Sequence, residues 1–320
     1  MEPTSYVSKV AIVGASGHLG QHFTKSLLAT KKHTITAVTR TGSKADFPSG
    51  VQIAEVDYND DGRSLISALR GHQFLIITMA ATAPRDTHSK IVKAAAEAGV
   101  PYIMPNVHGI DQFNDTLRRE AFPSLGDGLL ENIFEIERLG ASYIALVCGF
   151  WYEWSLALGD QWFGLDIKNK KVTFLDDGNT RIDTSTWSQC GEALAALLSL
   201  PEGGASPSLS EWKNKTLYIK SFTVSQRDML DSIHRVTGSS DDDWEISYES
   251  SKERYEEGLK EMQGGVWTGF VKVMYTRNFY PGQDGAKEFA NQKLALPEES
   301  LDEATMRAVE MVESGWNPFH

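Results

Sequence analysis

The sequence is poor in cysteine, and it has no grouping of cysteine, histidine and carboxylate residues with metal-ligand spacing. Its two cysteines are Cys148, inside the apolar stretch 143–150, and Cys190, beside a helical pattern. Thiols in such surroundings are typical of small, buried packing residues. We therefore expect neither a disulfide nor a bound metal.

Long apolar runs are also absent, since none approaches the roughly 18 residues of a membrane-spanning helix. The opening residues MEPTSYVSK lack the apolar segment of a signal peptide and the arginine-rich pattern of a transit peptide. The expected location is the cytoplasm. Basic residues are fewer than acidic ones, 31 against 43, and the formal net charge is -12. This negative charge disfavours direct binding to nucleic acid.

What is present in the first half is an alternation of short β-rich runs with helical patterns. This alternation is typical of a parallel sheet covered by helices on both faces, and six strands make it a doubly wound Rossmann sheet. The predicted strands cover residues 9–13, 34–38, 51–56, 74–79, 102–105 and 142–148, and the predicted helices cover 21–30, 62–69, 87–98 and 129–139.

Beyond residue 150 the regular alternation ends. We expect a Rossmann domain over residues 1–155 and a smaller α+β substrate lobe over 156–320, with interleaving of the two left open. The patterns there predict strands at 172–175 and 216–219 and helices at 188–200, 225–237, 250–262 and 301–313.

The glycine-rich turn GASGHLG, residues 14–20, runs directly from the first strand into a helix. Three glycines at this place allow a tight turn and a close approach of a dinucleotide pyrophosphate to the helix N-terminus. A turn that needs glycine only for helix–sheet packing is the alternative. We predict a nicotinamide dinucleotide site here.

The second strand ends in Val38-Thr39-Arg40, where an NAD site usually has an acidic residue for the ribose hydroxyl. Arg40 can instead pair with a 2′-phosphate, which favours NADP(H). Asp57, after the third strand, is placed to accept from adenine or to form a turn. Small residues of the segment 78–82 should pass beneath the ribose. The predicted cofactor-binding residues are Gly14, Ser16, Gly17, His18, Leu19, Gly20, Thr39, Arg40, Asp57, Thr78 and Ala80.

Five segments together carry a family resemblance: GASGHLG, VTR, VPYIMPNVHG, LGASYIALVCGFW and LALPEESLDEATMRAVEMV. The chain resembles the NmrA-like and isoflavone reductase-like atypical short-chain dehydrogenases, particularly their fungal members. The resemblance covers nearly the whole chain and is most specific in the nucleotide half. It implies a Rossmann domain, a preference for NADP(H), and a substrate pocket between that domain and a smaller C-terminal lobe.

The chain departs from this family at its catalytic position. Reductases of the group carry a lysine about one helix before the sixth strand, and the matching place here holds Gly128 or Leu129. The other familiar signature, Tyr-x-x-x-Lys, occurs only as Tyr248 to Lys252, which we interpret as a chance match. The sequence therefore predicts a site without the usual lysine.

Three other residues are candidates for proton transfer. His108 follows the fifth strand, at the sheet edge where ligands bind, and can exchange a proton near neutral pH. Asp111 is placed either to orient it or to cap the next segment. Tyr152 and Glu153 lie in the aromatic run 150–154 after the sixth strand. For His108 a backbone-bonded loop residue, and for the aromatic run simple packing, are the alternatives. Trp162, Trp187, Trp267 and Tyr275 would suit an aromatic cleft.

We interpret the chain as an NADP(H)-dependent oxidoreductase that acts on a mid-sized, aromatic specialised metabolite. The alternatives are a redox-sensing regulator that binds NADP(H) without turnover and a cofactor-bound non-redox cyclase or isomerase. No Ser-His-Asp order, HExxH motif or phosphate-loop lysine is present to indicate a hydrolase, a metalloprotease or a kinase. The expected partner is a small-molecule substrate, and the expected oligomeric state is a monomer or a homodimer.

Overall fold

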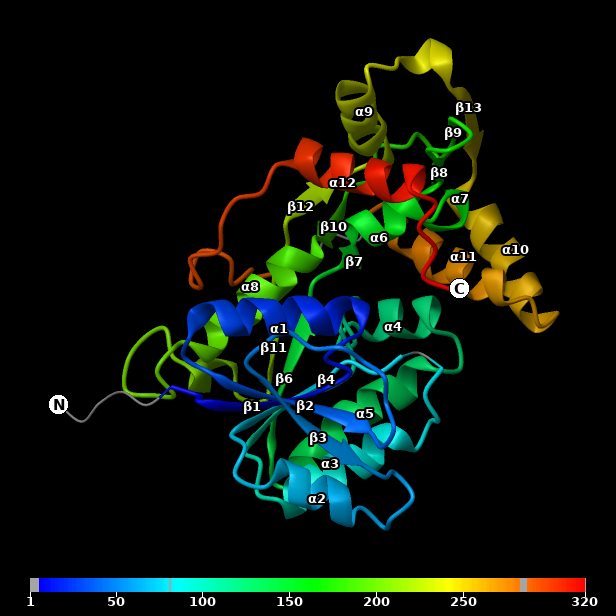
Figure 1. Cartoon of the computed structure of the whole chain (residues 1–320). Helices are drawn as coiled ribbons and strands as arrows, with labels where there is room; N and C mark the ends of the chain where they lie inside the picture. The colour runs from blue at the N-terminus through cyan, green and yellow to red at the C-terminus, as the bar shows by residue number, and fades with distance from the viewer. Residues whose placement is uncertain (1–5, 81, 283–286, 320) are drawn as a thin grey trace.

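The computed structural model describes residues 6–80, 82–282 and 287–319. Seven parallel strands form the main sheet, in the order β11-β6-β5-β4-β1-β2-β3 (Figure 1). Strands β2 and β3 extend from one side of β1 and β4 to β6 from the other, so the carboxyl end of β1 is the topological switch point of a Rossmann sheet. The strands are β1 (Lys9–Val13), β2 (Thr34–Arg40), β3 (Val51–Val56), β4 (Phe74–Ile77), β5 (Tyr102–Met104), β6 (Ser142–Val147) and β11 (Lys215–Tyr218).

Helices cover both faces of this sheet, and its central strands are apolar on both faces for that reason. Val10 and Ile12 of β1 belong to the core on one face, and Ala11 and Val13 to the core on the other. Two helices cover the first face and three cover the second (Figure 1). The first pair is α1 (His18–Thr30) and α8 (Trp187–Leu198), and the second set is α2 (Arg63–Leu69), α3 (Thr87–Glu97) and α5 (Gly126–Arg138).

A smaller C-terminal lobe stands over the carboxyl edge of the sheet (Figure 1). Two three-stranded sheets, β12-β10-β7 and β13-β9-β8, and the surrounding helices enclose its core. Its strands are β7 (Phe150–Trp151), β8 (Leu165–Asp166), β9 (Lys171–Leu175), β10 (Ile182–Ser185), β12 (Phe222–Val224) and β13 (Glu245–Glu249). Its helices are α4 (Asp115–Ala121), α6 (Tyr152–Ala157), α7 (Asp160–Phe163), α9 (Gln226–Thr237), α10 (Ser251–Gln263), α11 (Trp267–Asn278) and α12 (Leu301–Glu313), and short 3-10 turns cover Leu209–Trp212 and Asp241–Asp243.

Two segments beyond residue 155 belong to the Rossmann layers. Strand β11 pairs in parallel with β6, so the sheet has one strand more than the six predicted. Helix α8 packs on α1 so closely that a Cβ at Gly191 would lie 2.6 Å from Ser26 Oγ. The nucleotide domain and the lobe are therefore interleaved along the chain, the arrangement that the sequence left open.

Helix α11 is absent from the sequence prediction because it is buried on nearly every side, which removes the helical period of polar residues. Even its Lys272 is buried, where Nζ pairs with Glu257 at 3.1 Å and with Glu261 at 2.6 Å on α10. Within the described ranges, no helix has the length and apolar character needed to cross a membrane.

The first prediction concerns the packing of α1 on the turn that precedes it. A Cβ at Gly20 would lie 2.0 Å from the carbonyl oxygen of Gly14, whereas a Cβ at Gly128 of α5 would meet no atom within 4 Å. Gly20→Ala should lower the free energy of unfolding by roughly 1–3 kcal/mol through overpacking. Gly128→Ala should raise it by about 0.5–1 kcal/mol through helix propensity.

Urea denaturation of both variants measures this difference. Equal stability of the Gly20→Ala variant and the unaltered protein would show that α1 does not approach the turn as closely as described.

Candidate active site

The glycine turn is held by contacts of its own backbone with the end of β4. Gly14 has a φ of 81°, and a Cβ there would lie 2.2 Å from the carbonyl oxygen of Thr78. The Thr78 hydroxyl donates to the carbonyl oxygens of Val13 at 2.9 Å and Gly14 at 3.0 Å. Thr78, predicted to contact the cofactor, therefore braces the turn with its side chain.

The start of α1 has the features of an anion site. Gly17 is its N-cap and supplies no side chain to accept from the first-turn N–H groups, and no acidic residue stands in that turn. The dipole of a 13-residue helix adds positive potential at the same end. Ser16 is exposed and Gly17 half-buried, while Leu19 is buried in the core and serves packing. These residues fit the pyrophosphate of a dinucleotide.

Arg40 and Asp57 stand at neighbouring strand ends on the other side of the switch point. Arg40 is exposed at the end of β2, opposite Val56 of β3, and forms no ion pair with a described residue. Asp57 is exposed, and its Oδ1 accepts from the N–H of Asn59 at 2.9 Å, the turn-forming alternative. A contact of its other carboxylate oxygen with adenine stays a prediction. The edge also contains half-buried Thr39 and exposed Ala80, whereas Ala81 of the predicted 78–82 segment lies outside the described residues.

Tyr58 is a residue of this region that the sequence prediction missed. Burial raises the pKa of its hydroxyl, and the nearby positive charge of Arg40 opposes that shift. A half-buried aromatic ring near an exposed guanidinium suits the two faces of an adenine ring. Its position directly after Asp57 was the available signal.

His108 is a neutral imidazole whose hydrogen-bonding roles are set by its surroundings. Nε2 lies 2.7 Å from the carbonyl oxygen of Ile77, so it carries the proton and donates. Nδ1 is buried and has no partner among the described residues. Burial lowers the pKa of His108 from 6.5 to about 4. Asp111 does not orient it, because its oxygens accept from Phe113 N and Tyr218 Oη, both at 2.9 Å.

Tyr152 and Glu153 join helices α6 and α12. Tyr152 is fully buried, its hydroxyl lies 2.7 Å from Thr305 Oγ1, and burial raises its pKa. Glu153 is also buried, and Oε1 accepts from Arg307 at 2.9 and 3.1 Å while Oε2 has no partner among the described residues. Burial raises the pKa of Glu153 and the Arg307 charge opposes this. These contacts give both side chains a structural role, and their catalytic role stays a prediction.

The aromatic residues form three neighbouring groups, which touch where Trp154 meets Phe319 and where Trp162 meets Tyr275. Trp154 and Trp187 surround His18 together with Trp316, which the sequence prediction missed although a helix-ending glycine precedes it. Trp162 and the exposed Trp267 pack on each other and on Phe319. Tyr275 is buried in the lobe core with its hydroxyl 2.8 Å from Ser155 Oγ. The Tyr248 to Lys252 match is divided between β13 and α10 and makes no shared helix face.

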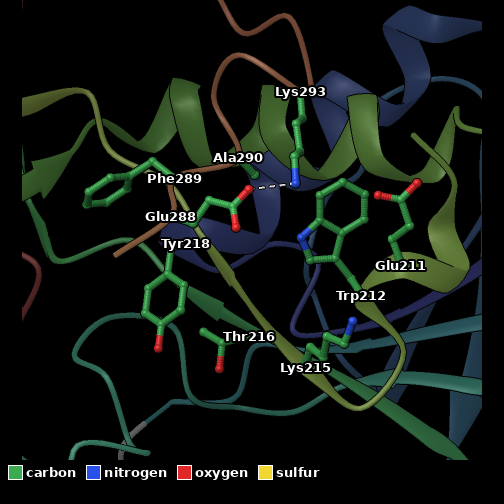
Figure 2. A pocket seen from close by; sticks show the side chains of 9 residues that line it. All are labelled: Glu211, Trp212, Lys215, Thr216, Tyr218, Glu288, Phe289, Ala290 and Lys293. Atoms are coloured by element: carbon green, nitrogen blue, oxygen red, sulfur yellow. Dashed lines mark ion pairs between the residues drawn. The ribbon is translucent and has the colours of Figure 1, made fainter. Parts of the chain in front are cut away.

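A cavity of about 290 Å³ lies apart from these residues, along edge strand β11 (Figure 2). Three strands separate β11 from β1, and none of the predicted site residues lines the cavity. Glu288 and Lys293 form an ion pair of 2.7 Å at its rim (Figure 2). The cavity is therefore not the nucleotide site.

The comparisons with known proteins agree with this geometry. A family model described as NAD(P)H-binding matches residues 14–142, which defines the class as a Rossmann-type NAD(P)H-binding protein. Oxidoreductase aprR of Aspergillus flavus is 26% identical over 302 residues, 92% of this chain and 96% of the relative. The isoflavone reductase homolog IRL of Zea mays is 27% identical over 247 residues, 72% of this chain and 75% of the relative.

Among solved structures, "AtPrR2 with NADP+ and (+)pinoresinol" superimposes with a TM-score of 0.74 at 19% identity. The superposition covers 94% of this chain and 98% of that one, so the likeness extends over both the sheet and the lobe. The chain is therefore similar to NAD(P)H-binding proteins of the NmrA/isoflavone reductase-like kind, in sequence and in fold.

The hydroxyl of Tyr152 provides a test of structural against catalytic roles. Tyr152→Phe should lower the free energy of unfolding by about 1 kcal/mol, because a buried hydrogen bond to Thr305 is lost. Tyr248→Phe is the matched control, since Tyr248 is 66% exposed, and should change stability little. Urea denaturation measures both variants. A Tyr152→Phe variant with unchanged stability and abolished turnover would make the residue catalytic.

Acid should destabilise the fold through its buried histidines. His22, His88 and His108 each have a pKa lowered by burial from 6.5 to about 4, so below pH 6.5 the unfolded chain binds more protons than the folded one. The stabilising effect of neutral histidine is complete above pH 6.5 and is lost as the pH falls toward 4.

The free energy of unfolding, measured by urea denaturation across this range, should therefore decline. The free energy of unfolding of the His108→Gln variant should decline less steeply, because one titrating group is gone. Identical slopes for the variant and the unaltered protein would exclude His108 from this effect.

Proposed function

We propose that the chain is an NADP(H)-dependent oxidoreductase of a mid-sized aromatic specialised metabolite, working without the lysine of its relatives. The observation that carries this proposal is the uncapped N-terminus of α1 at the switch point, with Arg40 exposed at the end of the next strand. The relative aprR is named an oxidoreductase, and the AtPrR2 structure is a complex with NADP+ and (+)pinoresinol.

The preference for NADP(H) over NAD(H) follows from the charge at the end of β2. Arg40 supplies a guanidinium without a competing ion pair among the described residues, and the exposed Ser43 and Lys44 follow it in the next turn. A 2′-phosphate would receive charge-assisted hydrogen bonds there, whereas the hydroxyl of NAD(H) would meet no carboxylate from β2.

When bound, a reduced nicotinamide supplies a hydride, which carries two electrons to the acceptor carbon of the substrate. The acceptor oxygen then needs a proton. The sequence of α5 contains no lysine, and His108, with a pKa of about 4 and its Nε2 proton held by Ile77 O, is unprotonated at Nδ1 near neutral pH. His108 therefore supplies no proton, and the proton for reduction comes from water.

The redox-sensing alternative rests on the same absence of a proton donor. The chain has neither a lysine in α5 nor a protonated His108. A protein that binds NADP(H) without such a donor would sense whether the bound cofactor is oxidised or reduced, and would not consume NADPH. A non-redox cyclase or isomerase would equally retain the cofactor. Consumption of NADPH with an added acceptor separates the oxidoreductase from both alternatives.

Turnover with a quinone tests both the oxidoreductase activity and the role of Arg40 in cofactor choice. Purified protein with 9,10-phenanthrenequinone should consume one NADPH for each hydroquinone formed. Arg40→Ala should reduce kcat/KM for NADPH roughly 10- to 100-fold, as expected for a lost charge-assisted hydrogen bond, and leave that for NADH nearly unchanged. Arg70→Ala is the control, because Arg70 is an exposed arginine at the end of α2. Absorbance of the reduced nicotinamide follows the reaction.

The outcomes separate the hypotheses. Binding of NADPH without its consumption, over a panel of quinones and aromatic enones, would favour the regulator. If Arg40→Ala leaves the ratio of kcat/KM for NADPH to kcat/KM for NADH unchanged, Arg40 does not determine the preference for NADP(H).

A further inference from the structure

Three tryptophans from distant parts of the chain converge on His18 in the glycine turn. The ring centroid of His18 lies 5.0 Å from Trp154, 5.9 Å from Trp187 and 6.0 Å from Trp316. The three tryptophans also contact one another, with centroids 5.4 to 6.4 Å apart. We call these four rings the His18 cluster. It joins the nucleotide turn to α6, α8 and the C-terminal segment in one aromatic surface.

Trp316 reaches the cluster because α12 ends in a defined turn. Gly315 has a φ of 71°, its N–H donates to Val312 O at 3.1 Å, and the N–H of Trp316 donates to Met311 O at 3.0 Å. This pair of bonds is the Schellman motif, which reverses the chain direction after a helix. The turn thereby brings Trp316 into contact with His18 at the start of α1.

The helix that carries Trp316 is itself fixed. Arg307 of α12 pairs with the buried Glu153 of α6, and Thr305 is hydrogen-bonded to the buried Tyr152. The position of Trp316 over the nucleotide turn is therefore set by buried contacts and not by its own packing alone.

Polar atoms without partners lie beside the cluster. Trp187 is only 9% exposed, and its indole N–H is buried without an acceptor among the described residues. The N–H of neighbouring Trp151 and Oε2 of Glu153 are in the same state. Buried donors without acceptors are costly, so this region holds polar groups that its packing leaves unsatisfied.

The cluster is suited to a ring and not to a phosphate. Burial lowers the pKa of His18, so all four rings are uncharged near neutral pH. Of the carboxylates nearby, Glu153 is paired with Arg307 and Glu299 accepts from Thr186. His18, Trp154 and Trp316 are each half-buried, which leaves part of their ring surface accessible. The phosphates have their own donors at the N-terminus of α1.

We propose that the His18 cluster is the subsite that receives a planar, uncharged aromatic ring of the substrate, stacked on the half-buried rings of His18, Trp154 and Trp316. Trp316 forms the wall of this subsite that the C-terminal segment contributes. This inference rests on the proposed function and specifies its substrate class as molecules with a stacking ring beside the cofactor turn.

The test is a calorimetric titration of the NADP+-saturated protein with 9,10-phenanthrenequinone. NADP+ cannot reduce this quinone, so the titration measures binding alone. Trp316→Ala should weaken binding of the quinone about 5- to 10-fold, the effect expected of a lost aromatic contact, and leave NADP+ affinity within about twofold. Trp316→Phe should restore most of the binding. Trp267→Ala is the matched control, because Trp267 is exposed and contacts none of the four rings.

The possible results are distinct. Unchanged or tighter quinone binding by Trp316→Ala overturns the inference, and so does the absence of quinone binding to the unaltered, NADP+-bound protein. Equal losses of NADP+ and quinone affinity would make the cluster a cofactor wall and also overturn it. Failure of NADP+ to bind would instead contradict the proposed function, and the quinone titration on the nucleotide-free protein would still decide the subsite.

Discussion

The close approach of Gly14, Gly20 and Thr78 is the constraint on which the functional half of the molecule depends. Atoms of Thr78 occupy the space that a side chain would need at Gly14, and atoms of Gly14 and Thr78 occupy that space at Gly20. Because of this contact, α1 begins at the switch point of the sheet with free N–H groups facing outward. The anion site and the position of His18 both follow from it.

The interleaved chain connects this turn to the lobe. Helix α8 packs on α1 and places Trp187 on His18, while β7 and α6 continue from β6 and bring Trp154 to the same place. Helix α12 closes the arrangement through Arg307 and the C-terminal Trp316. The lobe thus contacts the nucleotide turn through aromatic rings, and the ion pair of Glu153 with Arg307 fixes α12 on α6 within the lobe.

The sequence predicted the nucleotide half well because its signals are local. Strands 9–13 and 51–56 and the helix 301–313 agree with the structure at both ends, and the glycine turn lies at the predicted place. The membership of β11 in the main sheet was missed, since strand pairing over more than sixty residues leaves no local pattern. Helix α11 was missed because its buried surroundings erase amphipathic periodicity.

The candidate site was predictable only in part. Residue type and strand position indicated Arg40 and the glycine turn, but they could not show that Tyr152 is engaged with Thr305 or that Glu153 is paired with Arg307, both contacts across about 150 residues. The missed Trp316 likewise depends on where α12 ends in space.

A crystal structure of the NADPH complex tests the cofactor assignment most directly. We predict the pyrophosphate on the N–H groups at the start of α1 and the 2′-phosphate on Arg40. A nucleotide bound elsewhere, or a 2′-phosphate without contact to Arg40, would contradict this assignment.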